Sequence, residues 1–351
     1  MQPLLDSLAA VARRTPKDVW LMSSVGGRVF DDPRATRFVL DSVIPDHLVW
    51  INGWSGEQVL AMGITSVQDM TVGYELDRAR AVARRASAMR PHHRVIRFPI
   101  PAGRTVISND WRVSGADTAL APTMHISGVK WVLDGTPVEQ LALMRRPYAD
   151  RPGWYGRANF PFDTLRAIVR DALRRREQPM LHAVGDSTIA LVIAAMRAEG
   201  PDSAWRALRP RLEHADALGR DQLADIKKLG IIVVQNPAHL AIPEIMHARW
   251  GAERLRRIDM MRSLLDSGVT LAIGSDGPLE PGLNVMLATL HPNVPSEALT
   301  REQAVIAYTR QRRSRPLPSG NAGRSRRECS PISWCCRRTC PPRRPTSYRR
   351  R

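Results

Sequence analysis

Cysteine is missing from the first 310 residues of this 351-residue chain, and all four cysteines lie within residues 311–351. They are Cys329, Cys335, Cys336 and Cys340. The body of the protein therefore has neither a disulfide framework nor a thiolate metal site. A metal ion held by this body must be bound by imidazole and carboxylate ligands.

Long apolar runs are missing as well. No segment approaches the roughly 18 to 20 apolar residues that a membrane span requires. The N-terminal stretch MQPLLDSLAAVARR lacks the charged-then-apolar layout and the cleavage site of a secretory signal. We therefore expect a globular, cytoplasmic protein with no membrane partner.

The net charge of +18 is unevenly spread along the chain. Residues 311–351 contain 13 arginines and one acidic residue, which leaves 39 basic and 33 acidic residues, a net charge of +6, for the rest. The tail 310–351 has six prolines and no apolar periodicity, so we expect it to be disordered. Its composition resembles translation in a shifted reading frame. A nucleic-acid-binding arm is the functional alternative, while a metal knuckle would need a paired CxxC, which the tail lacks.

Short apolar strands alternate with helices from residue 63 to residue 309. Seven strands are predicted, at 64–70, 93–101, 128–134, 179–186, 210–216, 231–240 and 269–278. Helices are predicted between them, at 75–90, 162–178, 187–200, 220–230 and 255–268. This alternation is typical of a mostly parallel sheet covered by helices.

The number of strands favours a barrel over a doubly wound sheet, since no glycine-rich phosphate loop follows any of them. A TIM-type (β/α)8 barrel needs eight strands, so the sequence predicts an α/β fold with an incomplete, distorted barrel. We expect three parts: a barrel-associated segment at 1–62, the barrel at 63–309 and the tail at 310–351.

The stretch LHAVGD (181–186) brings one histidine to the end of a buried strand. His182 closes the apolar run, Gly185 permits a turn, and Asp186 is placed to cap the following helix. Taken alone, a histidine in the position of His182 is more often a hydrogen-bonded structural residue than a metal ligand.

The same arrangement recurs downstream and favours the metal ligand. RLEHAD places His214 at a strand end and LAIGSDGP places Asp276 at another, and Lys130 and His239 also lie at strand ends on this interpretation. The carboxyl ends of parallel barrel strands meet on one face, where active sites form. His and carboxylate groups there suit a divalent metal such as zinc, which activates water, while Asp276 exchanges protons as a general acid and base.

Several motifs, in this order and spacing, resemble the amidohydrolase superfamily, specifically its amidohydrolase-3 (YtcJ-like) branch. They are GITSVQDM, GVKWVLDG, YADRPGWYG, LHAVGD, RLEHAD, QNPAHL and AIGSDGP. The resemblance implies a metal-dependent hydrolase with one or two ions, usually zinc, that cleaves a non-peptide C–N bond of a small molecule. By motif, His182 and His214 resemble the strand-5 and strand-6 ligands, and Asp276 the strand-8 aspartate that contacts metal and shuttles protons.

The resemblance also gives roles to three further residues. Lys130 looks like the strand-4 lysine that becomes N-carboxylated and bridges two metals. The alternative is an ordinary lysine in an ion pair, because an unmodified lysine is protonated at pH 7 and is a poor ligand. His239 and Arg211 are candidates for substrate binding, with local structure as the alternative for each.

One feature of the family is absent from this sequence. The family barrel begins with a strand that ends in HxH, and no HxH occurs here. The resemblance then implies at most one well-formed metal site, with Lys130, His182 and His214 as ligands. Three protein ligands with an open position can still form a catalytic site. The alternative function is a catalytically impaired remnant of an amidohydrolase.

Overall fold

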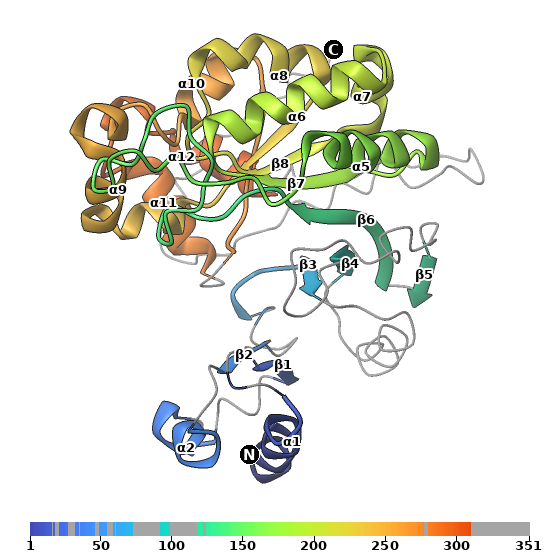
Figure 1. The fold of residues 1–351 in the computed structure, drawn as a ribbon, viewed down its shortest axis with the longest axis vertical. Helices are drawn as coiled ribbons and strands as arrows, with labels where there is room; N and C mark the ends of the chain where they lie inside the picture. Colours follow the sequence, from blue (N-terminus) through green and yellow to red (C-terminus); the bar gives the residue numbers. More distant parts are fainter. Residues whose placement is uncertain are drawn as a thin grey trace, which may run out of the picture. The chain divides into compact units, whose positions relative to one another are not determined.

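The computed structural model describes residues 1–15, 17, 21–26, 32–34, 36–45, 49–54, 59, 61–72, 92–98, 118–121, 124–276 and 280–309 (Figure 1). All of them belong to one unit, Met1–Ser314. The helix predicted at 75–90 and the tail predicted at 310–351 lie outside the described residues. None of the described helices is long and apolar enough to cross a membrane.

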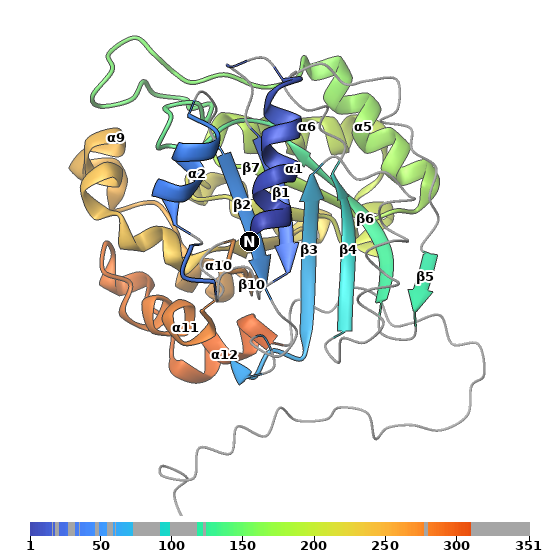
Figure 2. The same ribbon diagram turned by 90° about the horizontal axis from the view of Figure 1, so that it is seen from below.

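Seven parallel strands form the main sheet, as the sequence predicts. Their spatial order is β3, β4, β6, β7, β8, β9, β10, and β5 pairs antiparallel with β6 outside this row. The bounds are β3 Ser66–Val72, β4 His92–Phe98, β5 Thr118–Ala121, β6 Met124–Val132, β7 Pro179–Ala183, β8 Arg211–His214, β9 Ile232–Gln235 and β10 Thr270–Ile273. Figure 2 shows β3, β4 and β6 side by side. Within the described residues β3 and β10 end the row unpaired with each other, so the fold is an incomplete TIM-type barrel.

The helices after β6 pack on one face of this sheet, except α9, whose buried residues belong to a separate cluster. They are α5 Phe162–Arg175, α6 Asp186–Glu199, α7 Asp202–Leu208, α8 Leu223–Leu229, α9 Pro243–Leu255, α10 Met261–Asp266, α11 Pro281–Leu290 and α12 Arg301–Thr309, with short 3₁₀ turns η3 Arg220–Gln222, η4 Pro237–Ala241 and η5 Pro295–Glu297. In α5 the buried residues Leu165, Ile168 and Val169 recur at helical spacing and face the core. Figure 1 shows α5, α6 and α8 above β7 and β8.

Alternation along the strands separates the two faces of the sheet. Trp131, Leu181, Leu212 and Val233 pack with the helices in one large buried cluster. Ile232, Val234 and Ala272 form a separate cluster on the other face. Because successive side chains point to opposite faces, the residues between those of the helix-packed cluster line the inner, concave side. Lys130, His182 and Glu213 are among these inner residues.

The N-terminal segment contains two helices and two strands. Their bounds are α1 Gln2–Ala12, β1 Leu21–Gly26, α2 Arg37–Val43 and β2 Val49–Trp54. β1 and β2 pair in parallel as a two-stranded sheet. Leu8 and Ile44 are buried against each other, with Leu4 and Leu40 packed around them.

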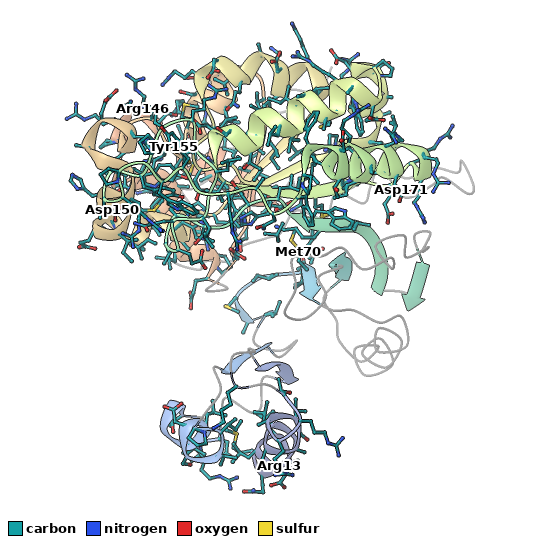
Figure 3. All side chains as sticks on the ribbon, viewed as in Figure 1. Arg13, Met70, Arg146, Asp150, Tyr155 and Asp171 are labelled. Atoms are coloured by element: carbon teal, nitrogen blue, oxygen red, sulfur yellow. The ribbon has the colours of Figure 1, made fainter. Side chains whose placement is uncertain are left out.

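The long connection between β6 and α5 packs against α9, a helix that the sequence analysis did not predict. Arg249 of α9 forms an ion pair with Asp150, and the rings of Tyr148 and Trp250 stack with centroids 6.3 Å apart. Figure 3 shows Arg146, Asp150 and Tyr155 of this connection. A kink at Gly251, with φ of 71°, interrupts the apolar period of α9, which explains why no regular pattern marked the helix.

The turn after β7 differs in one detail from the expectation. Asp186 was placed to cap α6, but Gly185 is the N-cap and no side chain caps this helix. Asp186 is the first residue of α6, and its carboxylate accepts a hydrogen bond from the amide of Arg145 at 2.8 Å. The carboxylate therefore connects α6 to the β6–α5 connection instead of closing the helix end.

Gly185 has no room for a side chain. A Cβ atom at this position would overlap the backbone carbonyl of Leu143. We expect Gly185→Ala to lower the free energy of unfolding by about 3 kcal/mol, because the backbone must shift to relieve the overlap. Urea unfolding followed by circular dichroism measures the change. Gly282→Ala is the matched control, since nothing lies within 4 Å of its Cβ; equal effects would contradict the prediction.

Candidate metal centre

The strand-end residues expected to bind metal lie close together. The rings of His182 and His214 are 4.4 Å apart at their centroids, and Nδ1 of His214 is 4.0 Å from Oδ2 of Asp276. Lys130 is buried, with 5% of its surface exposed, and its charge acts on both histidines and on Asp276. The carboxyl ends of β6, β7, β8 and β10 thus bring together one amine, two imidazoles and one carboxylate.

Left-handed backbone places two of these residues. His214 and Ala215 have φ of 73° and 52°, and Asp276 has φ of 53°. Such values are uncommon outside glycine and cost free energy, so the surrounding structure must hold them in place. The amide of Ala215 donates to the carbonyl of Ala183 at 3.2 Å, which ties the end of β8 to β7. Strain at these positions is typical of functional sites.

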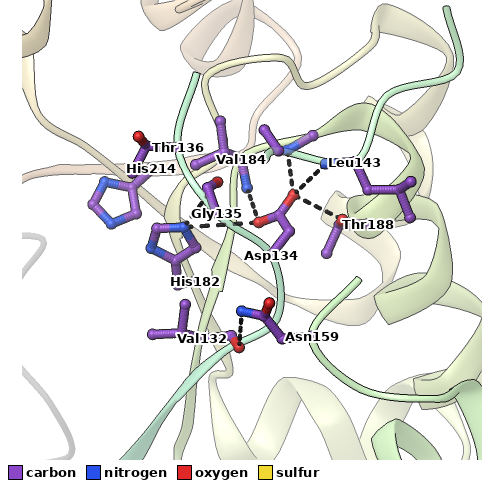
Figure 4. Close-up of polar contacts among 12 residues, drawn as sticks. Val132, Asp134, Gly135, Thr136, Leu143, Asn159, His182, Val184, Thr188 and His214 are labelled. Atoms are coloured by element: carbon purple, nitrogen blue, oxygen red, sulfur yellow. Dashed lines mark hydrogen bonds and ion pairs between the residues drawn. The ribbon is translucent and has the colours of Figure 1, made fainter. Parts of the chain in front are cut away.

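Asp134, which the sequence analysis did not single out, organises the ends of β6 and β7 (Figure 4). Its side chain is fully buried. It accepts four hydrogen bonds: from the amides of Leu143 at 3.1 Å, Val184 at 3.0 Å and Gly185 at 2.9 Å, and from the Thr188 hydroxyl at 2.8 Å. Burial raises the pKa of Asp134 to about 6 against the opposing effect of these donors. The carboxylate satisfies backbone groups that would otherwise be buried without partners.

His182 lies next to this carboxylate, and one of its ring nitrogens is oriented by the backbone. Nε2 is 3.4 Å from the carbonyl oxygen of Gly135 and 3.7 Å from Oδ1 of Asp134 (Figure 4). In the tautomer with the proton on Nε2, the N–H points to these oxygens and the lone pair of Nδ1 is free. An imidazole whose second nitrogen donates to a carbonyl is the usual arrangement of a metal-binding histidine.

Burial keeps both histidines neutral. It lowers the pKa of His182 well below its ordinary value and that of His214 to about 3, and the nearby Lys130 charge acts in the same direction. Burial also lowers the pKa of Lys130, opposed by the carboxylates of Glu213 and Asp276. A divalent metal requires neutral imidazole, and the N-carboxylated form expected of Lys130 requires a neutral amine. The burial of these side chains favours both the neutral imidazoles and the neutral amine.

His239 lies between two carboxylates. It belongs to the turn η4 after β9, where the strand ends at Gln235 instead of continuing as predicted. Nε2 of His239 is 3.5 Å from Oδ2 of Asp276, and Nδ1 is 3.9 Å from Oδ2 of Asp216. Burial acts to lower the pKa of His239, but the two carboxylates together raise it to about 10. Asp216, the last residue of the RLEHAD motif, was given no role by the sequence analysis. Its position two residues after His214 in that motif could have identified it as a residue of the site.

Arg211 is engaged inside the sheet. Its Nε is 2.7 Å from Oε1 of Glu213, its Nη2 donates to Oε2 of Glu213 at 3.0 Å, and its Nη1 donates to Oε1 of Gln68 on β3. Only 4% of the Arg211 surface is exposed. Contacts of this kind fit the alternative given above for Arg211, a role in local structure in place of substrate binding.

The comparisons with known proteins agree with this architecture. A model of the amidohydrolase family matches residues 54–313. The chain belongs to the amidohydrolase family. This matched range contains every strand of the main sheet and all the residues of the candidate metal centre.

Two curated relatives resemble this amidohydrolase. Protein LONG AFTER FAR-RED 3 of Arabidopsis thaliana is 26% identical over 204 residues, 55% of this chain and 35% of that protein. The putative amidohydrolase YtcJ of Bacillus subtilis (strain 168) is 26% identical over 162 residues, 46% of this chain and 30% of that protein. The chain thus spans about a third of the length of these relatives.

Two solved structures share the amidohydrolase fold. An uncharacterized metal-dependent hydrolase from Pyrococcus furiosus has a TM-score of 0.62 and 23% identity, over 81% of this chain and 57% of that one. Its counterpart from Pyrococcus horikoshii OT3 has a TM-score of 0.62 and 22% identity, over 80% and 56%. At this level of identity the similarity establishes the fold.

The donor atoms of this amidohydrolase fit a divalent metal. Ligand atoms about 2.0 to 2.1 Å from a tetrahedral ion lie about 3.3 Å from one another. The separations of Asp276 Oδ2 from His214 Nδ1 and His239 Nε2, 4.0 Å and 3.5 Å, are close to this value and too long for charge-assisted hydrogen bonds. Imidazole and carboxylate donors at these spacings suit zinc and similar ions, and His214 is already in the neutral form that a metal requires.

The depressed histidine pKa values predict a pH dependence of stability. A histidine whose pKa is lowered by folding binds fewer protons in the folded state, so its stabilising contribution is lost as pH falls below about 6.5. In the metal-free protein, the free energy of unfolding should fall as the pH is lowered from 6 to 5. His182 and His214 should each account for up to about 1.4 kcal/mol per pH unit of this decrease. Urea unfolding in EDTA at pH 7, 6 and 5 measures this. The same slope in His214→Gln would contradict the assignment to His214.

Proposed function

We propose that this protein is a metal-dependent hydrolase that cleaves a non-peptide C–N bond, such as an amide, in a small-molecule substrate. The observation that carries the proposal is the convergence of His182, His214 and Asp276 at the carboxyl ends of strands of one sheet: two neutral imidazoles with ring centroids 4.4 Å apart, and a carboxylate oxygen 4.0 Å from Nδ1 of His214. The match to the amidohydrolase family supports it over a remnant without catalysis.

Lys130, His182, His214 and Asp276 would hold the ion, for which zinc is our proposal. A divalent ion bound by them would supply a nucleophile at neutral pH, because it acidifies water toward a pKa of about 7. Lys130 would contribute as its carbamate, formed when the neutral amine adds to carbon dioxide and releases a proton. The buried environment of Lys130 supports this by favouring the neutral amine.

Asp276 would move the proton. Its side chain is 56% exposed, so substrate and water reach it, and the adjacent His239 lowers its pKa and keeps it ionised. As a carboxylate it can accept the proton of the attacking water and then deliver it to the leaving nitrogen. His239, whose side chain is 29% exposed, would contact the substrate beside it.

The experiment is hydrolysis by the full chain before and after metal removal. A panel of N-formyl and N-acyl amines, dipeptides and carboxylic esters is incubated with the protein, and the released amine, amino acid or acid is measured. We expect cleavage of the N-formyl or N-acyl amines, loss of activity after dialysis against dipicolinate, and recovery with zinc. Activity that survives complete metal removal, or that is confined to dipeptides or esters, would overturn the proposal.

A further inference from the structure

A second group of ligand atoms lies beside the proposed centre. One ligand atom each from His214, Asp216 and His239 can be chosen so that all lie within 4.8 Å of one another. The rings of His214 and His239 stack with an interplanar angle of 15° and centroids 5.5 Å apart. Two of the three residues, Asp216 and His239, lie outside the set proposed above. We propose that His214, Asp216 and His239 form a divalent-metal site of their own at the ends of β8 and β9.

Buried carboxyl groups beside His239 favour the binding of a cation. Asp216 is 3% exposed and Asp259 is 4% exposed, and each acts on a common neighbour, His239. Oδ2 of Asp259 is buried and has no hydrogen-bond partner among the described residues. Burial and the neighbouring Asp216 raise the pKa of Asp259 and favour its neutral form. The carboxylates that flank His239 are then Asp216 and Asp276, whose two negative charges exceed the single charge of an imidazolium. A divalent ion would neutralise this group more fully than a protonated His239 alone.

The distances favour an ion over direct hydrogen bonds. A charge-assisted hydrogen bond between imidazolium and carboxylate measures about 2.7 to 2.9 Å. His239 is 3.9 Å from Asp216 and 3.5 Å from Asp276, so its ring lies between the two carboxylates without a short bond to either. Ligand atoms about 2.0 to 2.2 Å from one tetrahedral ion lie about 3.3 to 3.6 Å apart, so a small movement of the Asp216 and His239 side chains would bring both to an ion between them.

The fold fixes these ligands in place through α11. Near its N-terminus, Asn284 accepts a hydrogen bond from the amide of Ala238, which holds the turn that carries His239. After its C-terminus, Nε2 of His291 donates to the carbonyl oxygen of Asp259 at 2.8 Å. The amide of Asp259 in turn donates to the carbonyl oxygen of Asp216 at 2.9 Å. Buried contacts of this kind support preformed ligand positions, as in other metal sites.

Two imidazoles and one carboxylate, with a position open to solvent, are the ligand number of catalytic zinc sites. The ion would lie next to Asp276, which contacts members of both ligand sets. This inference rests on the proposed function only because the two metal sites share His214. The second site can be absent while the hydrolase centre is present, and the reverse is also possible.

The test compares metal binding in two pairs of variants. Asp216→Asn and His239→Gln remove ligands of this site, whereas Lys130→Met and His182→Gln remove ligands of the set proposed above. His247→Ala, an exposed histidine on α9, is the control for histidine loss. Each full-length protein is stripped with dipicolinate and titrated with Zn²⁺, and bound metal is counted by elemental analysis. Co²⁺ titration gives an independent count from the visible spectrum.

We expect Lys130→Met and His182→Gln to retain one equivalent of zinc at the site of His214, Asp216 and His239. Asp216→Asn and His239→Gln should bind this equivalent at least about 100-fold more weakly. Zinc bound at this site should raise the Tm of Lys130→Met and His182→Gln. The Tm of Asp216→Asn and His239→Gln should not rise through this site. Full metal content and unchanged affinity in both Asp216→Asn and His239→Gln would overturn the inference and leave His239 as a structural imidazolium. If Asp216→Asn fails to fold, His239→Gln alone decides, because its side chain is partly exposed.

Discussion

Replacing Asp276 with asparagine is expected to reduce kcat by about 10²- to 10⁴-fold, the usual contribution of a positioned general acid and base. The amide keeps the size of the side chain and an oxygen near His214 and His239 but cannot carry a proton between water and the leaving nitrogen. The loss should be of similar size across the accessible pH range, since the low pKa of Asp276 keeps the wild-type carboxylate ionised throughout it. Steady-state kinetics on the best substrate of the amide panel, with bound metal counted in parallel, measure both effects.

Asp266→Asn is the matched control for this variant. Asp266 is an exposed aspartate at the end of α10 and has no contact with the site. We expect its kcat to remain within about twofold of wild type. An Asp276→Asn enzyme that retains its metal and more than about a fifth of the wild-type kcat would refute the proton-transfer role of this carboxylate.

Asp134→Ala is expected to lower the free energy of unfolding by about 3 to 5 kcal/mol, the cost of removing one partner from a buried charged network. Three backbone amides and the Thr188 hydroxyl would lose their acceptor in a place that water does not reach. His182 would also lose a neighbour 3.7 Å from its Nε2, so zinc affinity should fall by about 10- to 100-fold.

Urea unfolding in EDTA measures the stability of the Asp134 variants, and zinc titration measures their affinity. Asp163→Ala serves as the control, since this carboxylate is 93% exposed and its ion pair with Arg166 is on the surface. The control should change stability by less than about 1 kcal/mol. Asp134→Asn should lie between the two, because its amide oxygen still accepts hydrogen bonds while its NH₂ group faces donors. A cost for Asp134→Ala no larger than that of the control would contradict the buried network.

Local sequence patterns were sufficient to predict the seven parallel strands and the barrel-like order. A buried parallel strand is a short apolar run, and its end is marked by the polar residue that follows. This is why His182, His214 and Asp276 could be placed at one edge of the sheet before the structure was known. The incomplete barrel also followed from the count of strands, and the structure confirms it. Patterns failed where regular periodicity failed, as in α9 with its kink at Gly251.

The sequence by itself determined the strands, their common direction and the histidines and carboxylate that reach the inner edge, because period-two alternation is a local property. Only the tertiary structure decided what those side chains contact. Asp134 binds the amide of Gly185, 51 residues away, and Arg211 donates to Gln68, 143 residues away. His239 meets Asp216 and Asp276 through turns whose left-handed residues no alternation predicts. Such contacts depend on strand register and loop closure, which are set by packing across the whole sheet.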